Sequence, residues 1–344
     1  MKNKRILCLV FSLLFTLALL TACSGGSGGV GDGTNYPTED IHGYIAWAGG
    51  SIADGVMRTA TEMAAEDLGV SIPLTNQSGA SGSIAAQKVY SLEADGYTLL
   101  LTTEALALYG VLDLGDLDST GFIPVALLAK GDAVLVVPAD SPYDTYQDFI
   151  DDCLARPGEI RAATDGTGSL SYNSLALVEA VAGIDCSRET FAGADALLSA
   201  LQSGGTEASV VDLLTAIQHM ETGDIKALAA FSGERLVALP DIPTLAELDA
   251  GYRPYLKSWG TFYGVFVKEG TDDKIVGTLR DAFVKAMGED AFRSFCDGLG
   301  LTFLGLAGPE AANYIKDWQS AAAWALYDAG AAASPADLGI GQPA

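Results

Sequence analysis

The stretch Trp47-Ala48-Gly49-Gly50-Ser51-Ile52-Ala53-Asp54 decides how the rest of the chain is interpreted. It follows a short apolar run, residues 44–47, which is typical of a strand, and it precedes apolar residues at helical spacing from Val56 to Leu68. The pattern predicts a strand, a glycine turn and the start of a helix. Ser51 and Asp54 stand three positions apart, the spacing of a capping box with Asp in the usual Glu position.

The same glycine turn has the features of an anion site. Gly49 and Gly50 let the backbone turn sharply and expose its N–H groups. These groups and the positive end of the helix dipole favour an anion, and Ser51 adds a hydroxyl. The alternative is a helix cap without a ligand, which the turn taken alone favours. Because the charge of Asp54 would repel an anion, we expect Asp54 to brace the loop.

The first 22 residues have the features of a lipoprotein signal peptide. Basic residues precede an apolar run from Ile6 to Leu20, and small residues lead into Cys23. This arrangement resembles the lipobox of bacterial lipoproteins, which implies cleavage before Cys23 and a lipid on its thiol. An ordinary signal peptide or a single anchor helix are the alternatives. Residues 23–35 are mostly Gly and Ser and are expected to form a flexible tether to the lipid bilayer.

The charge of the chain excludes several classes of partner. The chain has 19 basic and 44 acidic residues, a formal net charge of −25. Removal of residues 1–22 takes away three basic residues and no acidic ones, which leaves −28. Such an acidic surface argues against binding of nucleic acid and against docking on an anionic membrane. We expect a monomer that is extracytoplasmic and lipid-anchored to the bacterial cell membrane.

Cysteine and histidine give no sign of a metal centre. The folded part contains Cys153, Cys186 and Cys296, an odd number that cannot all pair internally. Cys153 and Cys186 could pair, but we expect three buried free thiols. His42 and His219 have no Cys or carboxylate cluster at metal-ligand spacing. We expect no metal, no cofactor and no catalytic residue.

Strand and helix patterns alternate along the rest of the chain. A strand is expected at residues 72–76, a second glycine turn at 79–82 and a buried strand at 97–101. The alternation predicts an α/β lobe with a largely parallel sheet. Thr102 and Thr103 follow the buried strand, at the edge where open α/β sheets usually bind ligands. A ligand-binding role and a structural role are equally compatible with these two threonines.

A third glycine turn repeats the pattern of the first. It consists of Gly166, Thr167, Gly168 and Ser169, between a strand at 160–163 and a helix at 175–182. Its amides and hydroxyls are expected to form a second grip on the ligand, and the alternative is a plain strand–helix turn. Ser171 is an alternative cap for the following helix.

Two acidic residues follow strands that end near the same edge. Asp212 stands at the end of a strand at residues 209–211, where it could accept a hydrogen bond from a ligand or only order the turn. Glu104 follows Thr103. In a cleft, Glu104 would favour a ligand with a cationic group such as an amino acid. We slightly favour a surface position for this residue.

Several motifs together resemble the extracytoplasmic solute receptors of tripartite tricarboxylate transporters, also called Bug receptors. The motifs lie in order between residue 41 and about residue 305, which is nearly all of the mature chain. The matching segments are Gly49-Gly50-Ser51, Gly79-Ala80-Ser81-Gly82, Asp95-Gly96-Tyr97-Thr98, Pro124-Val125-Ala126-Leu127, Gly166-Thr167-Gly168-Ser169, Leu239-Pro240-Asp241-Ile242-Pro243-Thr244 and Ser258-Trp259.

This resemblance implies a type II periplasmic-binding-protein fold, in which two α/β lobes are joined by two crossover strands with a ligand cleft between them. Lobe one would contain residues 36–130 and 232–344, and lobe two residues 131–231. A small carboxylate would be held by the loops at Gly49–Asp54 and Gly166–Ser171. Two membrane-embedded transporter subunits would receive it.

The sequence departs from the family pattern at the expected pocket wall. The family often has Pro where Ala48 stands, and His then Leu where Tyr172 and Asn173 stand. It usually has a small neutral loop after Thr102, where this chain has Glu104. These departures leave the identity of the ligand open.

Three other functions are compatible with the same fold. They are a binding protein for an ATP-driven importer of a phosphonate or sulfonate, a sensory receptor, and an extracytoplasmic hydrolase. The hydrolase is the least expected, because no Gly-x-Ser-x-Gly elbow with suitable partners is present.

Overall fold

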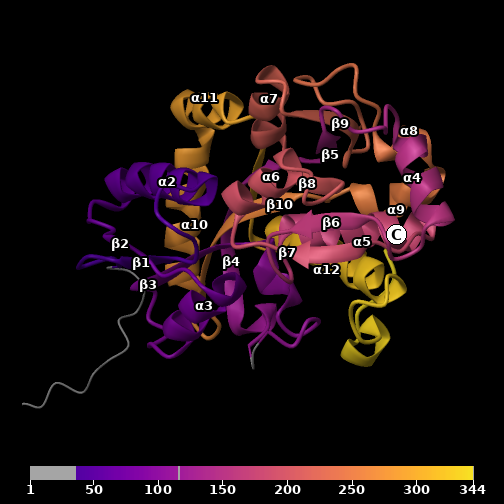
Figure 1. Ribbon diagram of the computed structural model, residues 1–344. Coiled ribbons are helices and arrows are strands. Elements are labelled where there is room, and N and C mark those ends of the chain that lie inside the picture. The colour runs from indigo at the N-terminus through magenta and orange to yellow at the C-terminus, as the bar shows by residue number, and fades with distance from the viewer. Residues whose placement is uncertain (1–35, 115–116, 344) are drawn as a thin grey trace, which may run out of the picture. The chain divides into compact units, whose positions relative to one another are not determined.

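A computed structural model describes residues 36–114 and 117–343 (Figure 1). The expected signal peptide, Cys23 and the tether at residues 23–35 lie outside the described residues. Within the described part, no helix has both the length and the apolar character needed to cross a bilayer.

The first sheet has six strands in the order β11-β4-β10-β3-β1-β2. They are β1 (His42–Ile45), β2 (Leu74–Asn76), β3 (Thr98–Thr103), β4 (Phe122–Gly131), β10 (Thr261–Lys268) and β11 (Leu301–Ala307). Strand β1 is parallel to β2 and β3, as the alternating pattern predicted, but β10 is antiparallel to β3 and β4, and β11 is antiparallel to β4. Parallel pairing in this sheet is therefore limited to β1, β2 and β3.

Helices that accompany the first sheet come from both ends of the chain. They are α2 (Ile52–Leu68), α3 (Ser83–Tyr90), α10 (Asp273–Gly288), α11 (Asp290–Gly298) and α12 (Gly308–Asp328), with short 3₁₀ turns η1 (Ala80–Gly82), η2 (Glu104–Leu108), η3 (Ser119–Gly121) and η5 (Pro335–Leu338). Helices α2 and α10 pack on each other although more than 200 residues separate them, and Figure 1 shows them side by side.

The second sheet has five strands in the order β7-β6-β8-β5-β9. They are β5 (Ala133–Pro138), β6 (Arg161–Thr164), β7 (Ser187–Thr190), β8 (Ala208–Asp212) and β9 (Ile225–Ala230), and the helices between them are α4 (Tyr146–Ala155), α5 (Leu170–Ala182), α6 (Ala194–Gln202) and α7 (Leu213–Glu221). Strand β6 is parallel to β7 and β8, whereas β5 is antiparallel to β8 and β9.

The chain passes between the sheets at two neighbouring points. Strand β4 of the first sheet and β5 of the second are separated by Asp132 alone. After β9, the N–H of Phe231 donates to the carbonyl oxygen of Ala133 at 2.9 Å, so the returning chain lies beside the first crossing. Asp132 accepts from Lys130 at 2.5 Å and from Thr302 of β11 at 3.2 Å, which anchors this junction.

The segment after β9 contacts elements of the second sheet and also helix α12. It contains α8 (Leu245–Leu248), η4 (Ala250–Tyr252) and α9 (Arg253–Leu256). The buried hydroxyls of Tyr252 and Tyr146 lie 2.5 Å apart, and the N–H of Ala230 donates to Pro243 at 2.9 Å. The apolar side chains of this segment join a core that contains residues of α4, α5, α12 and both sheets.

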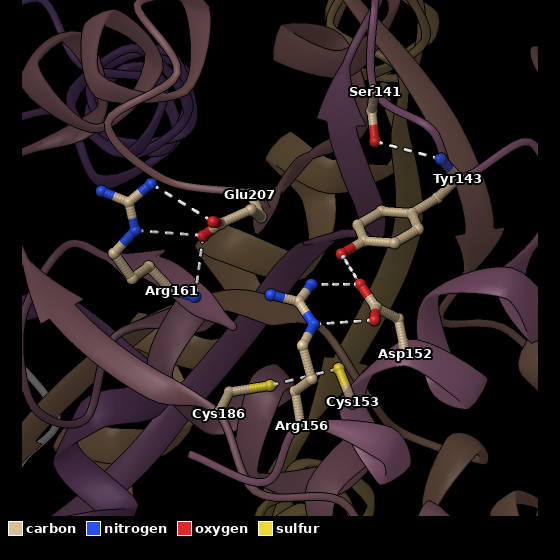
Figure 2. A network of polar contacts seen from close by, with 8 residues as sticks. All are labelled: Ser141, Tyr143, Asp152, Cys153, Arg156, Arg161, Cys186 and Glu207. Carbon is tan, nitrogen blue, oxygen red and sulfur yellow. Dashed lines mark hydrogen bonds and ion pairs between the residues drawn. The ribbon is translucent and has the colours of Figure 1, made fainter. Parts of the chain in front are cut away.

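The three cysteines of the described part are buried free thiols, as expected. Figure 2 shows Cys153 of α4 facing Cys186 just before β7, with 3.8 Å between the two sulfur atoms. On the same helix, Asp152 accepts from Arg156 at 2.9 Å and from the hydroxyl of Tyr143 at 2.6 Å. The Arg156 guanidinium and this hydroxyl lower the pKa of Asp152 to about 2, so α4 carries an ionised carboxylate.

Candidate functional site

The loop that starts α2 is held by its own side chains. The Oγ of Ser51 accepts the N–H of Asp54 at 3.2 Å, and Asp54 Oδ2 accepts the N–H of Gly50 at 3.0 Å. Arg58 and Asn76 donate to Asp54 Oδ1 at 2.6 and 2.7 Å. Burial raises the pKa of Asp54, but these hydrogen bonds outweigh it and hold that pKa below its usual value. Asp54 therefore lies in the loop as an ionised brace.

Two of the backbone N–H groups that we expected to bind a carboxylate already donate hydrogen bonds within the loop. The N–H of Gly50 is bonded to Asp54, and the N–H of Ser51 donates to the carbonyl oxygen of Ala48 at 3.3 Å. The hydroxyl of Ser51 donates to the same oxygen at 2.8 Å. Of the three amides, only that of Gly49 has no hydrogen-bond partner among residues 36–114 and 117–343.

The loop that starts α5 has more amides available. Gly166, Thr167 and Gly168 have N–H groups without a hydrogen-bond partner in the described ranges. Gly166 has a φ of +118° and Gly168 one of +81°, conformations that residues with a Cβ rarely adopt. Three amides without partners in the described ranges precede the cap of a 13-residue helix, an arrangement that suits an anion.

Ser169, and not Ser171, caps α5. Ser169 Oγ accepts the N–H of Tyr172 at 3.2 Å, which is the capping bond. Ser171 Oγ accepts the N–H of Asp165 at 2.9 Å and donates to the carboxylate of the same residue. The alternative that Ser171 caps this helix is wrong, because Ser171 already lies inside the first turn.

The second loop touches elements of the first sheet. Ser81, in the turn after β2, donates its hydroxyl to the carbonyl oxygen of Thr167 at 3.0 Å. Tyr109, next to η2, donates to the carbonyl oxygen of Ser81 at 2.9 Å. These two bonds connect the expected grip of the second sheet to the end of β3.

The end of β3 holds three polar side chains in the interior. Thr102, Thr103 and Glu104 are 0%, 2% and 3% exposed. The surface position that we favoured for Glu104 is wrong, because β10 pairs with β3 here and covers it. Thr261 of β10 donates to Glu104 Oε1 at 3.3 Å. Within residues 36–114 and 117–343, Glu104 Oε2 and the hydroxyls of both threonines have no partner with hydrogen-bond geometry.

Burial also controls the charge of Glu104. It raises the pKa of this carboxyl to about 8, opposed by the neighbouring hydroxyls of Thr261 and Thr103 and reinforced by the negative charge of Asp165. At pH 7 Glu104 is therefore mostly protonated in this structure. A carboxyl at the ligand edge of a sheet with such a raised pKa is a frequent mark of a functional site.

Asp212 has the contacts of a helix cap. It accepts the N–H of Thr215 at 3.0 Å and the hydroxyl of Thr215 at 2.6 Å, at the start of α7. Both bonds agree with the interpretation that Asp212 only orders the turn between β8 and α7. A contact between Asp212 and a ligand stays a prediction.

Residues 56–322 match the sequence model of the "Tripartite tricarboxylate transporter family receptor". The match covers well over half of the chain. The chain belongs to this receptor family. Among curated relatives, Protein BugT of Bordetella pertussis is 28% identical over 273 residues, which is 78% of this chain and 82% of BugT.

Solved structures agree with this receptor family. A TctC solute binding protein from Polaromonas has a TM-score of 0.69 and 26% identity, over 85% of the receptor and 99% of that chain. MatC from Rhodopseudomonas palustris, with bound malate, has a TM-score of 0.70 and 26% identity. The match covers 83% of the receptor and 100% of the MatC chain. The receptor thus has the type II periplasmic-binding-protein fold, and both its family and its fold are those of solute-binding receptors.

A surface pocket of the receptor lies away from the expected site. It has a volume of about 500 Å³ and is lined by α9, α12 and residues 338–343, including an ion pair between Lys257 and Asp317. None of the site residues expected from the sequence lines it. Because its lining side chains are mostly exposed, the buried groups at the end of β3 are the stronger candidate for ligand contact.

Sequence reasoning missed several residues that surround this candidate site. Thr261 reaches Glu104 only through the pairing of β10 with β3. Asn173 was noted only as a departure from the family, yet it is buried and donates to the carbonyl oxygen of Gly168 at 3.0 Å. Its Oδ1 has no partner in the described ranges. Within the same ranges, no group of three metal-binding side chains could hold an ion.

Proposed function

We propose that this receptor captures a small carboxylate outside the cytoplasm and delivers it to two membrane-embedded transporter subunits. The observation that carries the proposal is the set of unpartnered amides of Gly166, Thr167 and Gly168 at the N-terminus of α5. Malate, the molecule bound to MatC, is an acid of this class. The receptor binds its ligand and does not turn it over.

The carboxylate binds to amides and hydroxyls instead of to a salt bridge. Gly49 adds one free amide from the first loop, and Ser169 and Thr167 add hydroxyls from the second. Neutral donors held in a fixed geometry stabilise an anion without an ion pair. This matters in a chain of net charge −25, whose long-range field repels an anionic ligand.

Binding closes two lobes about the crossings at Asp132 and Phe231. Lobe one comprises residues 36–130 and 232–344, and lobe two comprises residues 131–231. The hydrogen bond between Ser81 and Thr167 joins the lobes in the closed arrangement. The mature receptor is a monomer anchored to the membrane through a lipid on Cys23.

Calorimetric titration with aliphatic carboxylates, phosphonates and sulfonates of matched chain length tests the proposal. We expect a carboxylate to bind at least about tenfold more tightly than its phosphonate partner, a difference of about 1.4 kcal/mol. Stabilisation by a phosphonate with no response to any carboxylate would overturn it. Loss of the bound acid over time, followed by NMR, would show turnover and would equally contradict it.

A further inference from the structure

The end of β3 contains a buried carboxyl oxygen that has no hydrogen-bond partner in the part of the chain that the structure describes. Glu104 is 3% exposed, and its Oε2 has no hydrogen-bond partner within residues 36–114 and 117–343. The hydroxyl of Thr103 is equally buried and lies close enough to this carboxyl to oppose the rise of its pKa, and it has no other partner in the described ranges. An unsatisfied buried polar group costs about 1–3 kcal/mol, so native structures seldom keep one without a function.

The groups that face this carboxyl are acidic or neutral. The charge of Asp165, in the second loop, reaches Glu104 and raises its pKa further. Burial raises the pKa of the phenols of Tyr109, Tyr263 and Tyr314, which lie just after η2, in β10 and in α12, and the nearby Glu104 raises each of them further.

The basic residue at the neighbouring crossing is already paired. Lys130 forms its ion pair with Asp132, with 2.5 Å between Nζ and Oδ1. No ion pair of Glu104 with a Lys, Arg or His is present in the part of the chain that the structure describes. Without a basic partner nearby in that part of the chain, Glu104 has no cation to balance its charge when it ionises, and an ammonium group of a ligand could supply that cation.

We propose that Glu104 binds an ammonium group of the ligand, so that the receptor selects amino-substituted carboxylates over plain ones. The inference rests on the proposed function, because it places the carboxylate of the same ligand on the amides of Gly166–Gly168. Asp165 immediately precedes these amides, and its charge acts on Glu104, so the loop and this carboxyl lie near each other. Thr103 offers the ammonium group a second acceptor.

Protons are coupled to this binding in a defined direction. The carboxyl of Glu104 is mostly protonated at pH 7 and must lose its proton to pair with an ammonium group. Affinity for an amino-substituted ligand therefore rises with pH. Below the pKa of Glu104 it should increase by up to about tenfold per pH unit, and above that pKa it should level off. One proton is released on binding, and the amino group of the ligand keeps its own.

Matched ligand pairs test the proposal. We would titrate the receptor with glutarate and glutamate, and with butyrate and γ-aminobutyrate, in each case in buffers of low and high ionisation enthalpy. At least one amino-bearing member should bind tenfold or more tightly than its partner and should release a proton. The Glu104→Gln variant keeps the size of the side chain and should lose this preference.

Glu179→Gln is the control, because Glu179 is a buried carboxyl of α5 that already pairs with Arg188. It should lower stability and leave the preference intact. Equal preference in wild type and Glu104→Gln overturns the proposal, and so does affinity that falls as the pH rises, since Glu104 would then donate its proton to the ligand. Failure of every carboxylate in both pairs, with binding of a phosphonate, overturns the proposed function as well.

Discussion

The loops that start α2 and α5 have the same backbone and different hydrogen bonding. Gly50 and Gly168 precede the cap serine in each, with φ values of +84° and +81°. Each cap serine accepts the N–H three residues ahead at 3.2 Å, and each donates its own N–H to the carbonyl three residues before, at 3.3 and 3.1 Å.

One position separates the two loops. Three residues after the cap, α2 has Asp54, whose carboxylate occupies the N–H of Gly50. The equivalent residue of α5 is Tyr172, which instead packs against Arg188, whose guanidinium carbon lies 4.7 Å from the ring centre. The N–H of Gly168 stays free as a result. An intact capping-box carboxylate and an anion site therefore compete for the same amide.

The carboxyl groups beside the two loops differ in charge as well. Asp54 is held ionised by Arg58, Asn76 and the N–H of Gly50, whereas Glu104, near the second loop, is held protonated by burial. The first loop is thus a self-contained structural cap. The second is open to a ligand.

The largest expected effect is the pH dependence that Glu104 brings to stability. Its folded-state pKa, about 8, lies above the value of 4.5 for an unperturbed Glu, so the folded state binds the extra proton between these values. The free energy of unfolding should then fall as pH rises from 4.5 to 8, by up to roughly 5 kcal/mol.

Glu104→Gln removes this titration. Urea denaturation from pH 5 to pH 9 should show a gap that opens in favour of the variant as the pH rises. A constant gap across that range would mean that Glu104 is ionised in the folded receptor throughout, and would remove the contrast with Asp54.

The second effect concerns the brace itself. Asp54→Ala leaves the N–H of Gly50 without its acceptor and removes the ion pair with Arg58, so it should lower the free energy of unfolding by about 2–3 kcal/mol. Because the pKa of Asp54 is lowered in the folded state, this contribution is present above about pH 4 and is lost as the pH falls further. Tyr172→Ala, at the matched position of α5, should cost only about 1 kcal/mol.

Chemical denaturation of both variants at pH 7 and pH 3 measures the difference. At pH 3 the wild type and Asp54→Ala should be closer in stability than at pH 7. Similar losses for Asp54→Ala and Tyr172→Ala would show that the two positions do not differ in the way their contacts indicate.

The third effect separates the loops by ligand affinity. Gly168→Ala strains a left-handed backbone and brings a Cβ to 3.2 Å from Leu112, so it should move the free amides and weaken carboxylate binding at least about tenfold. Gly50→Ala carries similar backbone strain with no atom within 4 Å, and should change stability but not affinity.

Gly166→Ala serves as a second variant of the ligand loop, because nothing lies within 4 Å of the added Cβ. Calorimetric titration gives the affinities, and melting temperatures check that each variant folds. A greater loss of affinity from Gly50→Ala than from both second-loop variants would place the grip on the first loop instead.

The smallest expected effect comes from converting one loop into the other. Tyr172→Asp places a carboxylate where it can bond the N–H of Gly168, as Asp54 does with that of Gly50. Carboxylate affinity should fall several-fold, by about 1 kcal/mol, while Tyr172→Asn should change it less. If Tyr172→Asp binds the ligand as wild type does, the competition between cap and ligand is absent.

The sequence was informative wherever neighbours along the chain decide the structure. The strand, turn and helix around Ser51 were predicted correctly, and so was the bracing position of Asp54 three residues later, because these bonds lie within one helical turn. The same reasoning could not choose between Ser169 and Ser171 as the cap of α5. Both residues have the right hydroxyl, and only the observed backbone shows where the helix begins.

Distant residues decided the rest. Glu104 is buried because Thr261, 157 residues away, lies on a strand that pairs with β3. The segment at Thr244–Leu256 lies beside α4 because Tyr252 meets Tyr146 in a shared core. The apolar pattern of the sequence indicates that a segment is buried, but it does not indicate which distant segment packs against it.

By itself, the sequence determined the α/β order of elements, the glycine turns and their caps, since hydrophobic periodicity and bonds over three or four residues act locally. Tertiary structure alone decided which amides stay free, which carboxyl is ionised and which is neutral. Those properties depend on burial and on charges brought together by strand pairing, and no spacing along the chain encodes them.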